Sequence, residues 1–317
     1  MIIKPEDLKI NKSENYIVGL SGGADSLCLT ILLHELNLNM SACIIDHKLR
    51  PESSTEILPI IDILKKRKIK YEVLTWNHCA DIGGNIEQKA REARYDLLYK
   101  YCKDQNCNNL CIAHHGLDQW ETFFMRLSKG SGIRGLSSIQ PIIKYKDINI
   151  LRPLLDFSPA DIKETLRYYG IFSYVLDPMN NDLHYERVRW RKAYSDFEKY
   201  NLNIKNINKS IERIQLANNC LDKISQEYMY KIFDEKVIKL DEFRKLHLEI
   251  QMRILNLVVL KFFPEKQIIS YDLLMRMALK ISSKNFVATN FSGLIFKRSK
   301  NIIVFLENRI KFKKNNI

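Results

Sequence analysis

The chain has 317 residues, with 50 Lys and Arg against 37 Asp and Glu, which gives a formal net charge of +13. Apolar residues make up 46% and charged residues 27%, and this mixture excludes a disordered chain and a collagen-like repeat. No apolar run approaches the ~20 residues that a membrane helix needs, and Glu6 and Asp7 lie where a secretory signal would be apolar. We therefore expect a cytoplasmic protein of about two domains, without a membrane partner.

The cysteines and the excess of positive charge narrow the class further. The seven cysteines form no CxxC pair, and the tightest spacing, Cys107-x3-Cys111, lacks a second pair that would complete a zinc site. We expect reduced, structural thiols. A pI of 9.3 is typical of proteins that bind nucleic acid, although general enrichment in lysine explains it equally well.

Strand-like and helix-like segments alternate through the first 150 residues. Short apolar runs predict strands at 16–20, 40–45, 71–75 and 110–113. Helical spacing of apolar residues predicts helices at 27–36, 57–68, 85–103 and 114–129. A strand near 150 and a helix from Asp161 follow. This alternation predicts an α/β fold, a Rossmann-like parallel sheet with helices on both faces and a ligand at the carboxyl ends of its strands.

A polar segment rich in Asn and Lys, 196–205, predicts a linker between two domains. Residues 1–195 then form the catalytic domain, and 205–317 form a smaller, mostly helical C-terminal domain. Its helical patterns lie at 211–233 and 241–262, and its short terminal strands at 286–289, 294–297 and 302–306.

The most informative motif is SGGADS, at 21–26, directly between a predicted strand and a predicted helix. Its two glycines allow a tight turn close to an anion, and the loop N–H groups and the helix N-terminus would face that anion. Asp25 can hold Mg²⁺ that bridges phosphates. The motif is neither GxxxxGK[ST] nor GxGxxG, which disfavours kinase-type and dinucleotide sites. A Gly/Ser turn that only caps the helix is the alternative.

SGGADS resembles the SGGxDS loop of the ATP pyrophosphatase, or PP-loop, family, which grips pyrophosphate while a substrate is adenylated. After the second strand, residues 46–53 (DHKLRPES) are similar to the DHxLRxxS segment of one branch, the tRNA(Ile)-lysidine synthetases, beside the adenosine half of ATP. The resemblance implies ATP binding by Ser21, Gly22, Gly23, Ala24, Asp25, Ser26, Asp46 and His47.

Two further segments resemble the same branch. Residues 84–95 are similar to GNxExxARxxRY, and Arg91 and Arg94 lie on neighbouring helical turns where they can stabilise charge at the α-phosphate or the activated base. An ordinary exposed helix with ion pairs is the alternative. Residues 113–122 (AHHGLDQWET) resemble AHHxDDQxET, with Leu117 replacing the first acidic residue.

The spacing of His114, Asp118 and Glu121 predicts one helix face. That face could hold a metal, but it suits a cationic amino acid better, and the resemblance implies that Asp118 and Glu121 bind lysine. A purely structural His114 is equally compatible with the sequence.

Basic motifs follow downstream. Residues 128–136 are similar to RGxGxxGL, with Lys129 in place of arginine, so charge is kept but the bidentate fork is lost. Residues 152–155 fit RPLL, and 177–191 loosely match DxSNxxxxYxRNxxR, with Met179 and Val188 as departures. A solvated helix face is the alternative for the last basic run, which includes Arg191. The expected contacts to phosphate or tRNA are Arg94, Lys129, Arg134, Arg187 and Arg189.

Together the motifs resemble tRNA(Ile)-lysidine synthetase in a short form with one C-terminal domain. The implied reaction joins L-lysine to C2 of the wobble cytidine C34 in the CAU-anticodon tRNA(Ile), using ATP and Mg²⁺ through an adenylated intermediate, and switches decoding to AUA. The implied catalytic residues are Asp25, Arg91, Asp118 and Glu121.

Other functions fit the sequence less well than this reaction. The missing CxxC disfavours a tRNA thiolase, and an amidotransferase would need a nucleophilic N-terminal cysteine. A non-catalytic tRNA-binding protein and a plain ATP-binding regulator fit the acidic motifs less well. No obligatory protein partner is evident, and a homodimer is left open.

Overall fold

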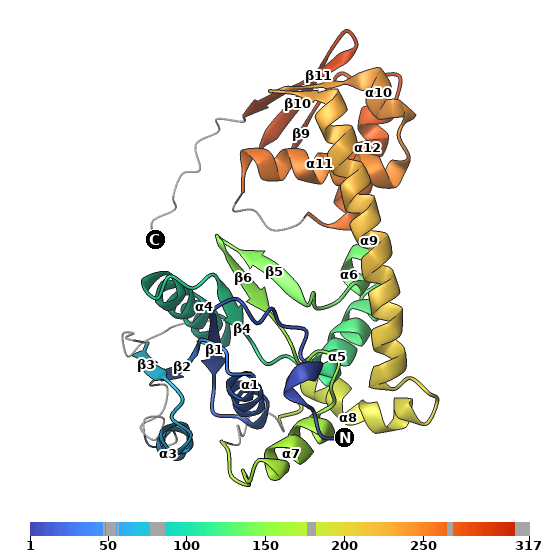
Figure 1. Cartoon of the computed structure of the whole chain (residues 1–317). Helices are drawn as coiled ribbons and strands as arrows, with labels where there is room; N and C mark the ends of the chain where they lie inside the picture. Colours follow the sequence, from blue (N-terminus) through green and yellow to red (C-terminus); the bar gives the residue numbers. More distant parts are fainter. Residues whose placement is uncertain are drawn as a thin grey trace. The chain divides into compact units, whose positions relative to one another are not determined.

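The computed structural model describes residues 1–46, 48, 55, 57–76, 86–175, 182–264 and 269–307, without the side chains of 86–88 and 307. The chain forms two compact units, Met1–Arg213 and Ile214–Ile317, which we call the N-terminal and C-terminal units (Figure 1). The boundary lies within helix α9 (Ile204–Ile232), beyond the segment 196–205 that predicts a linker.

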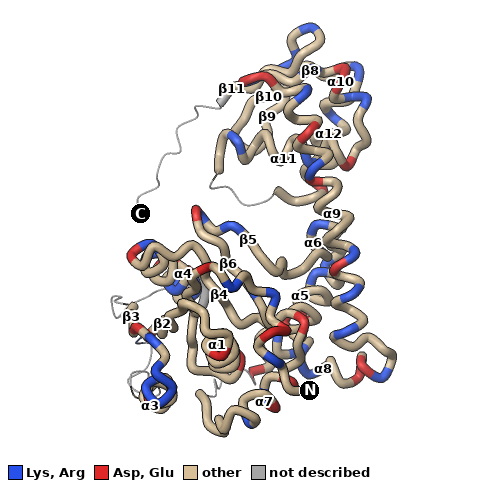
Figure 2. Tube along the Cα trace, in the orientation of Figure 1, with Lys and Arg blue, Asp and Glu red and all other residues tan. Residues whose placement is uncertain are grey.

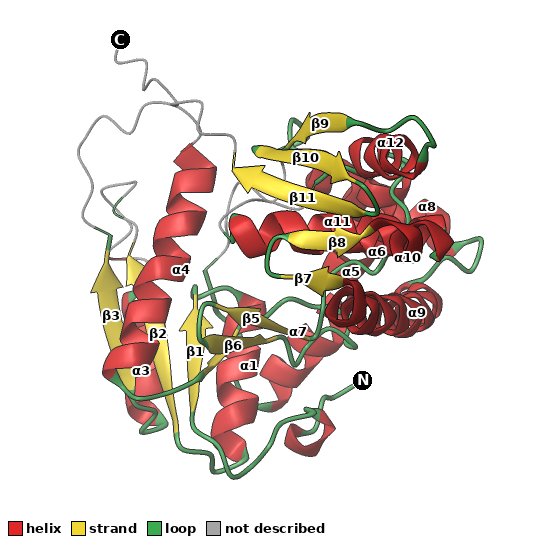
Figure 3. Ribbon diagram, turned by 90° about the horizontal axis from the view of Figure 1, so that it is seen from above, coloured by secondary structure: helices red, strands yellow, loops and turns green. Residues whose placement is uncertain are grey.

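The N-terminal unit is built on a six-stranded sheet with the order β3-β2-β1-β4-β6-β5. Figure 3 shows β3, β2 and β1 side by side. The first five strands are parallel, and β5 closes the edge as an antiparallel hairpin with β6. The strands are β1 (Tyr16–Leu20), β2 (Met40–Asp46), β3 (Tyr71–Thr75), β4 (Asn109–Cys111), β5 (Ile142–Tyr145) and β6 (Ile148–Leu151). The predicted parallel sheet is confirmed, with one additional hairpin strand, β5, that the sequence pattern did not predict.

Helices cover both faces of this sheet, as predicted. Side chains alternate along a strand, so Val18 packs into a cluster with helices α1 (Ala24–Glu35), α3 (Leu58–Lys66) and α7 (Pro159–Tyr168). Its neighbour Ile17 points the other way, toward Leu98 and Cys102 of α4 (Ile86–Asp104). Helices therefore bury both faces of the sheet, which explains why its strands are continuous apolar runs.

The remaining helices of this unit position the site. They are the 3₁₀ helix η1 (Pro5–Asp7), α5 (Gly116–Leu127), α6 (Ile133–Leu136) and α8 (Glu186–Glu198). Helices α5 and α8 pack through an aromatic cluster in which the rings of Trp120 and Trp190 have centroids 6.2 Å apart. The Trp120 Nε1–H donates to the Leu202 carbonyl at 2.6 Å, which satisfies the one polar atom of that buried indole. This packing fixes the register of α8 against α5.

The C-terminal unit contains a five-stranded antiparallel sheet, ordered β7-β8-β11-β10-β9, with a helical layer. Its elements after α9 are β7 (Phe233–Asp234), β8 (Val237–Lys239), α10 (Leu240–Lys245), α11 (Leu248–Phe262), α12 (Tyr271–Ser282), β9 (Ala288–Phe291), β10 (Leu294–Ser299) and β11 (Ile302–Glu307). The helix predicted at 241–262 is two helices, because His247 caps α11 by accepting from the Glu249 N–H.

Basic side chains are spread over both units. Lys and Arg lie on both units, and α3 ends in a basic run at 65–68 (Figure 2).

Five described cysteines are buried in the N-terminal unit, whereas Cys220 is exposed on α9. Burial raises the pKa of Cys28 and Cys43 to about 12, so these thiols stay protonated. None of the helices in the described ranges is long and apolar enough to cross a membrane.

Candidate functional site

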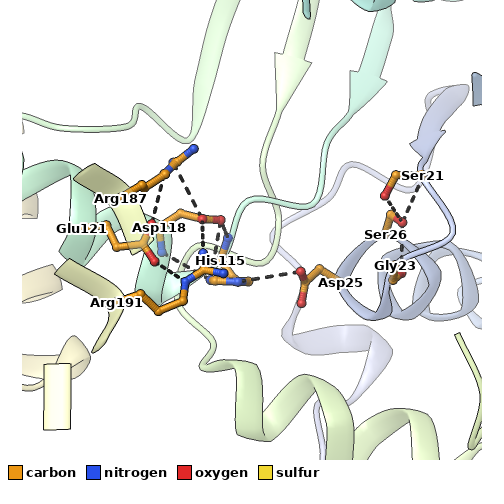
Figure 4. Close-up of polar contacts among 9 residues, drawn as sticks. All are labelled: Ser21, Gly23, Asp25, Ser26, His115, Asp118, Glu121, Arg187 and Arg191. Atoms are coloured by element: carbon orange, nitrogen blue, oxygen red, sulfur yellow. Dashed lines mark hydrogen bonds and ion pairs between the residues drawn. The ribbon is translucent and has the colours of Figure 1, made fainter. Parts of the chain in front are cut away.

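The SGGADS loop joins β1 to α1 in a conformation held by its own hydrogen bonds. The Ser21 N–H donates to Ser26 Oγ at 3.2 Å, and the Ser26 hydroxyl donates to the Gly23 carbonyl at 3.1 Å (Figure 4). Gly22 has φ of +83°, and a Cβ there would meet Val175 at 3.0 Å, so glycine is required on both grounds. The loop is thus shaped before any anion arrives.

A cavity of about 240 Å³ opens beside this loop, at the carboxyl ends of β1, β2 and β4. Its polar lining comes from Ser21, Asp25, Ser26, Arg94 and His114. The other lining residues are Gly19, Leu20, Ile45, Leu98, Ile112 and Ala113. Burial lowers the pKa of Arg94, although an arginine stays protonated in any case. A cavity lined by apolar side chains together with a cation and two hydroxyls suits a nucleotide.

His114 lies just before α5, outside the helix in which the sequence placed it. Helix α5 starts at Gly116, so the predicted single face with Asp118 and Glu121 is wrong for this histidine. Its Nδ1 accepts from the Nε–H of Arg152 at 3.3 Å. Burial, with Arg152 nearby, lowers the pKa of His114 to about 4.

The next residue, His115, joins the phosphate loop to α5. It is the N-cap of α5: its Nδ1 accepts from the Asp118 N–H at 3.3 Å, and its own N–H donates to Asp118 Oδ2 at 3.0 Å. On the other side, His115 Nε2 lies 3.7 Å from Asp25 Oδ2 (Figure 4). One buried imidazole therefore lies between the carboxylates of two separate motifs.

Glu121 lies one turn further along α5 and is fully buried. Arg187 Nε donates to its Oε2 at 3.0 Å and Arg191 Nε to its Oε1 at 2.6 Å, so two guanidinium groups of α8 occupy both oxygens. The Nη2 atoms of the same arginines lie 3.7 and 3.6 Å from Asp118 Oδ1. Figure 4 shows both arginines reaching across to the two acids.

The three carboxylates have different pKa shifts. Burial raises the pKa of Asp25 and of Glu121, against the opposing pull of His115 and Arg191 respectively. Burial would also raise the pKa of Asp118, but His115 and Arg187 outweigh it and hold the pKa below its ordinary value. Asp118 is therefore the acid that remains anionic most firmly.

The other residues predicted for the site lie around this centre. Asp46 is buried at the end of β2 and accepts from the Lys48 N–H at 3.0 Å, whereas His47 falls outside the described residues. Arg91 is exposed, with its guanidinium 5.4 Å from the centre of the Tyr95 ring.

Three predicted phosphate contacts are farther along the chain. Lys129 pairs with Glu186 at 2.6 Å, Arg189 donates to two carbonyls of 183–184, and Arg134 lies on α6. Within the described ranges, these contacts of Lys129 and Arg189 do not join them to the Asp25–Asp118 centre. Their predicted roles stay predictions.

The motifs did not predict site roles for His115 and Arg152, and they pointed to Arg191 only as part of a basic run that could contact tRNA phosphate or C34. A signal existed for His115, because Asp118 three residues later forms a capping box with it. Arg152 and Arg191 each lie in a motif, but the sequence did not indicate their partners, which are 38 and 70 residues away in the chain.

Comparison with known proteins places these features in a family. The model of the PP-loop domain matches residues 2–196. The tRNA(Ile)-lysidine synthase of Wolbachia sp. subsp. Brugia malayi (strain TRS) is 33% identical over 92% of this chain and 70% of its own length. The enzyme of that name from Wolbachia pipientis wMel is 32% identical over the same shares.

A solved structure agrees on the fold. The U34-tRNA thiolase NcsA from Methanococcus maripaludis superposes with a TM-score of 0.55, at 20% identity over 66% of this chain and 73% of that one. On the strength of the domain match and the length of the sequence matches, this chain belongs to the PP-loop family and, within it, to the tRNA(Ile)-lysidine synthases.

Proposed function

We propose that this chain makes lysidine in tRNA(Ile). In the first step O2 of C34 attacks the α-phosphorus of ATP, the bond to pyrophosphate breaks, and an adenylated cytidine forms. In the second step the ε-nitrogen of L-lysine attacks C2, the C2–O bond breaks, AMP leaves, and the amine loses its proton. The products are lysidine, AMP and pyrophosphate.

The observation that carries this proposal is the joining of two motifs through one side chain. His115 lies 3.7 Å from Asp25 of the phosphate loop and 3.5 Å from Asp118 of α5. A nucleotide held by the loop and an amine held by Asp118 would therefore meet at one place, which turns an encounter of two substrates into a local reaction.

Charge at this place also favours a cationic substrate. Three carboxylates, of Asp25, Asp118 and Glu121, face two guanidinium groups, of Arg187 and Arg191. With all five of these groups ionised, they carry one net negative charge, which an ammonium group would neutralise. Since Asp118 stays anionic and its side chain is 13% exposed, it is the proposed partner of the lysine amine.

Glu121 has a different part in this proposal. Its side chain is fully buried and both oxygens accept from arginine, so it acts on the substrates through Arg187 and Arg191.

The nucleophile of the second step must be the neutral lysine amine, because an ammonium group has no lone pair.

The phosphate side uses the SGGADS loop. Its N–H groups at the start of α1 and the hydroxyls of Ser21 and Ser26 bind the leaving pyrophosphate, and the half-buried Arg94 offsets negative charge beside them. Among the described residues no group of three or more His, Cys, Asp or Glu side chains suits a metal. Mg²⁺ can be bound by a single carboxylate together with phosphate oxygens and water, and Asp25 could supply that carboxylate. Such an ion would neutralise phosphate charge.

The test is a labelling reaction with the whole chain. Purified protein, ATP, Mg²⁺ and labelled L-lysine are incubated with an unmodified CAU-anticodon tRNA(Ile) transcript. Label retained in the RNA, and lost when C34 is replaced by U, is the expected result. Bound tRNA without label would overturn the proposal, and release of pyrophosphate in that same reaction would direct attention to another adenylated product.

A further inference from the structure

Arg152, of the RPLL motif, is nearly buried and directed at the cavity histidine. Its exposed fraction is 9%, its Nε–H donates to His114 Nδ1 at 3.3 Å, and its Nη1–H donates to the Gln140 carbonyl at 2.7 Å. The Arg152 N–H also donates to the Pro141 carbonyl at 2.9 Å, just before the β5–β6 hairpin. The segment that leads into the hairpin thus holds both the guanidinium and the backbone of Arg152.

This contact decides which nitrogen of His114 carries the proton. A guanidinium has donors only and stays protonated in proteins, so Nδ1 must be the acceptor. A neutral imidazole then carries its single hydrogen on Nε2. Because His114 lines the cavity with Ser21, Asp25 and Ser26, Nε2–H is the donor left to meet a ligand there.

We propose that Arg152 is a positioning residue that locks His114 in the neutral Nε2–H form, so that His114 donates a hydrogen bond to a phosphate oxygen of the nucleotide. The choice of ligand rests on the proposed function, whereas the tautomer rests on the contact alone. A protonated histidine would bind the anion more strongly in the ground state, whereas a neutral donor allows the product to leave.

The charges around His114 are compatible with a neutral ring. Asp118 favours the protonated form, whereas Arg152, Arg187 and Arg91 oppose it, and burial adds to their effect. The balance keeps the ring neutral across the physiological range. Of these groups, only Arg152 donates a hydrogen bond to the imidazole within the part of the chain that the structure describes.

Nuclear magnetic resonance tests the tautomer without any turnover. Long-range ¹H–¹⁵N correlation of histidine-labelled full-length protein distinguishes the two neutral forms, His114→Asn assigns the signal among the seven histidines, and the exposed His184 is an internal reference. We expect an unprotonated Nδ1 on His114 that persists at pH 5, where an ordinary histidine is charged. An Nδ1–H form, or a charged ring at pH 5, overturns the proposal.

Variants test the cause. Arg152→Met should mix the two tautomers and move the His114 titration toward 6.5. Arg126→Met is the control. It removes a guanidinium that donates to the carbonyls of 135 and 138, and the His114 signal should not move. An unchanged His114 signal in a folded Arg152→Met overturns the role of Arg152. Should that variant not fold, the wild-type tautomer decides, with Arg152→Lys as the milder change.

The ligand is tested separately. Adding ATP with Mg²⁺ to the wild-type protein should shift the His114 Nε2 resonance, and no shift overturns the donor role whether or not lysine is incorporated. Failure of lysine labelling with the expected tautomer and shift would instead count against the proposed function. In the labelling assay we expect Arg152→Met to lose about 100-fold in kcat/KM, with a new dependence on pH near 6.5.

Discussion

Each compact unit buries an arginine–carboxylate cluster, and the two clusters are built the opposite way round. In the N-terminal unit the buried group is the acid, Glu121, and its two arginines are 41% and 33% exposed. In the C-terminal unit the buried group is Arg253, 3% exposed, which pairs at 2.7 Å with both Asp222 and Glu249. The outer layer is therefore cationic in one cluster and anionic in the other.

The two clusters therefore differ in role. The N-terminal cluster belongs to the candidate site, whereas the C-terminal cluster is a brace, by which we mean a contact that holds two helices together. Arg253 joins α9 to α11, and its acids lie on those two helices, so its contacts hold the C-terminal unit together. The arginines of α8 instead reach beyond Glu121 to Asp118, beside the phosphate loop. A buried acid with cations outside can present those cations to a substrate, whereas a buried cation with hydrated acids outside mainly fixes helices.

The largest effect is expected where the N-terminal cluster meets its substrates. Asp118→Asn and Asp25→Asn each keep the shape of the side chain but remove its charge. We expect lysine incorporation to fall by at least about 100-fold while the tRNA still binds. Turnover at the wild-type rate in either purified, folded variant would remove that residue from the site.

The next effect concerns the buried acid itself. Glu121→Ala leaves two guanidinium groups facing each other without their shared carboxylate. Breaking a buried pair costs about 3–5 kcal/mol, and the lower end applies here because the arginines can rehydrate. Urea unfolding measures the loss, and Glu121→Gln, which keeps an acceptor, should recover part of it. A loss below that of Arg253→Met would contradict the contrast between the clusters.

The pH dependence of stability should report on the N-terminal unit. The pKa of His114 is lowered to about 4 in the folded state, against about 6.5 when unfolded, so the unfolded chain binds the extra proton between these values. Its contribution to the free energy of unfolding is complete above pH 6.5 and falls as the pH drops toward 4, by at most about 3 kcal/mol. Unfolding free energies of wild type and His114→Asn, compared at pH 7 and pH 4.5, measure it. Equal changes in both would refute the assignment.

The smallest effect is expected in the C-terminal cluster. Arg253→Met removes the shared cation, but Asp222 and Glu249 are 35% and 25% exposed and can turn to water. We expect a loss of about 1–3 kcal/mol in the unfolding of that unit. Arg276→Met is the matched control, because this exposed arginine donates to the Asp272 carbonyl of its own helix at 3.4 Å. A loss no larger than that of the control would show that the brace contributes nothing.

The sequence predicted what is local and missed what is assembled from a distance. The strand, the glycine turn and the helix around SGGADS follow one another in the chain, so their pattern was readable. The start of α5 was placed two residues early, because His115 ends the extended segment as an N-cap. The engagement of Glu121 was not readable at all, since its arginines come from α8, 66 and 70 residues later. Strand β5 escaped because a short edge hairpin has little apolar periodicity.

The buried cysteines allow local opening of the N-terminal unit to be measured. Buried thiols on α1, β2, α4 and β4 react with an alkylating reagent only when the layer around each of them separates, because the reactive thiolate is suppressed inside. Cys220, exposed on α9, reacts at once and calibrates the reagent. Mass spectrometry of timed alkylation would then show, with no engineered label, which layer of the sheet opens first and whether ATP slows it.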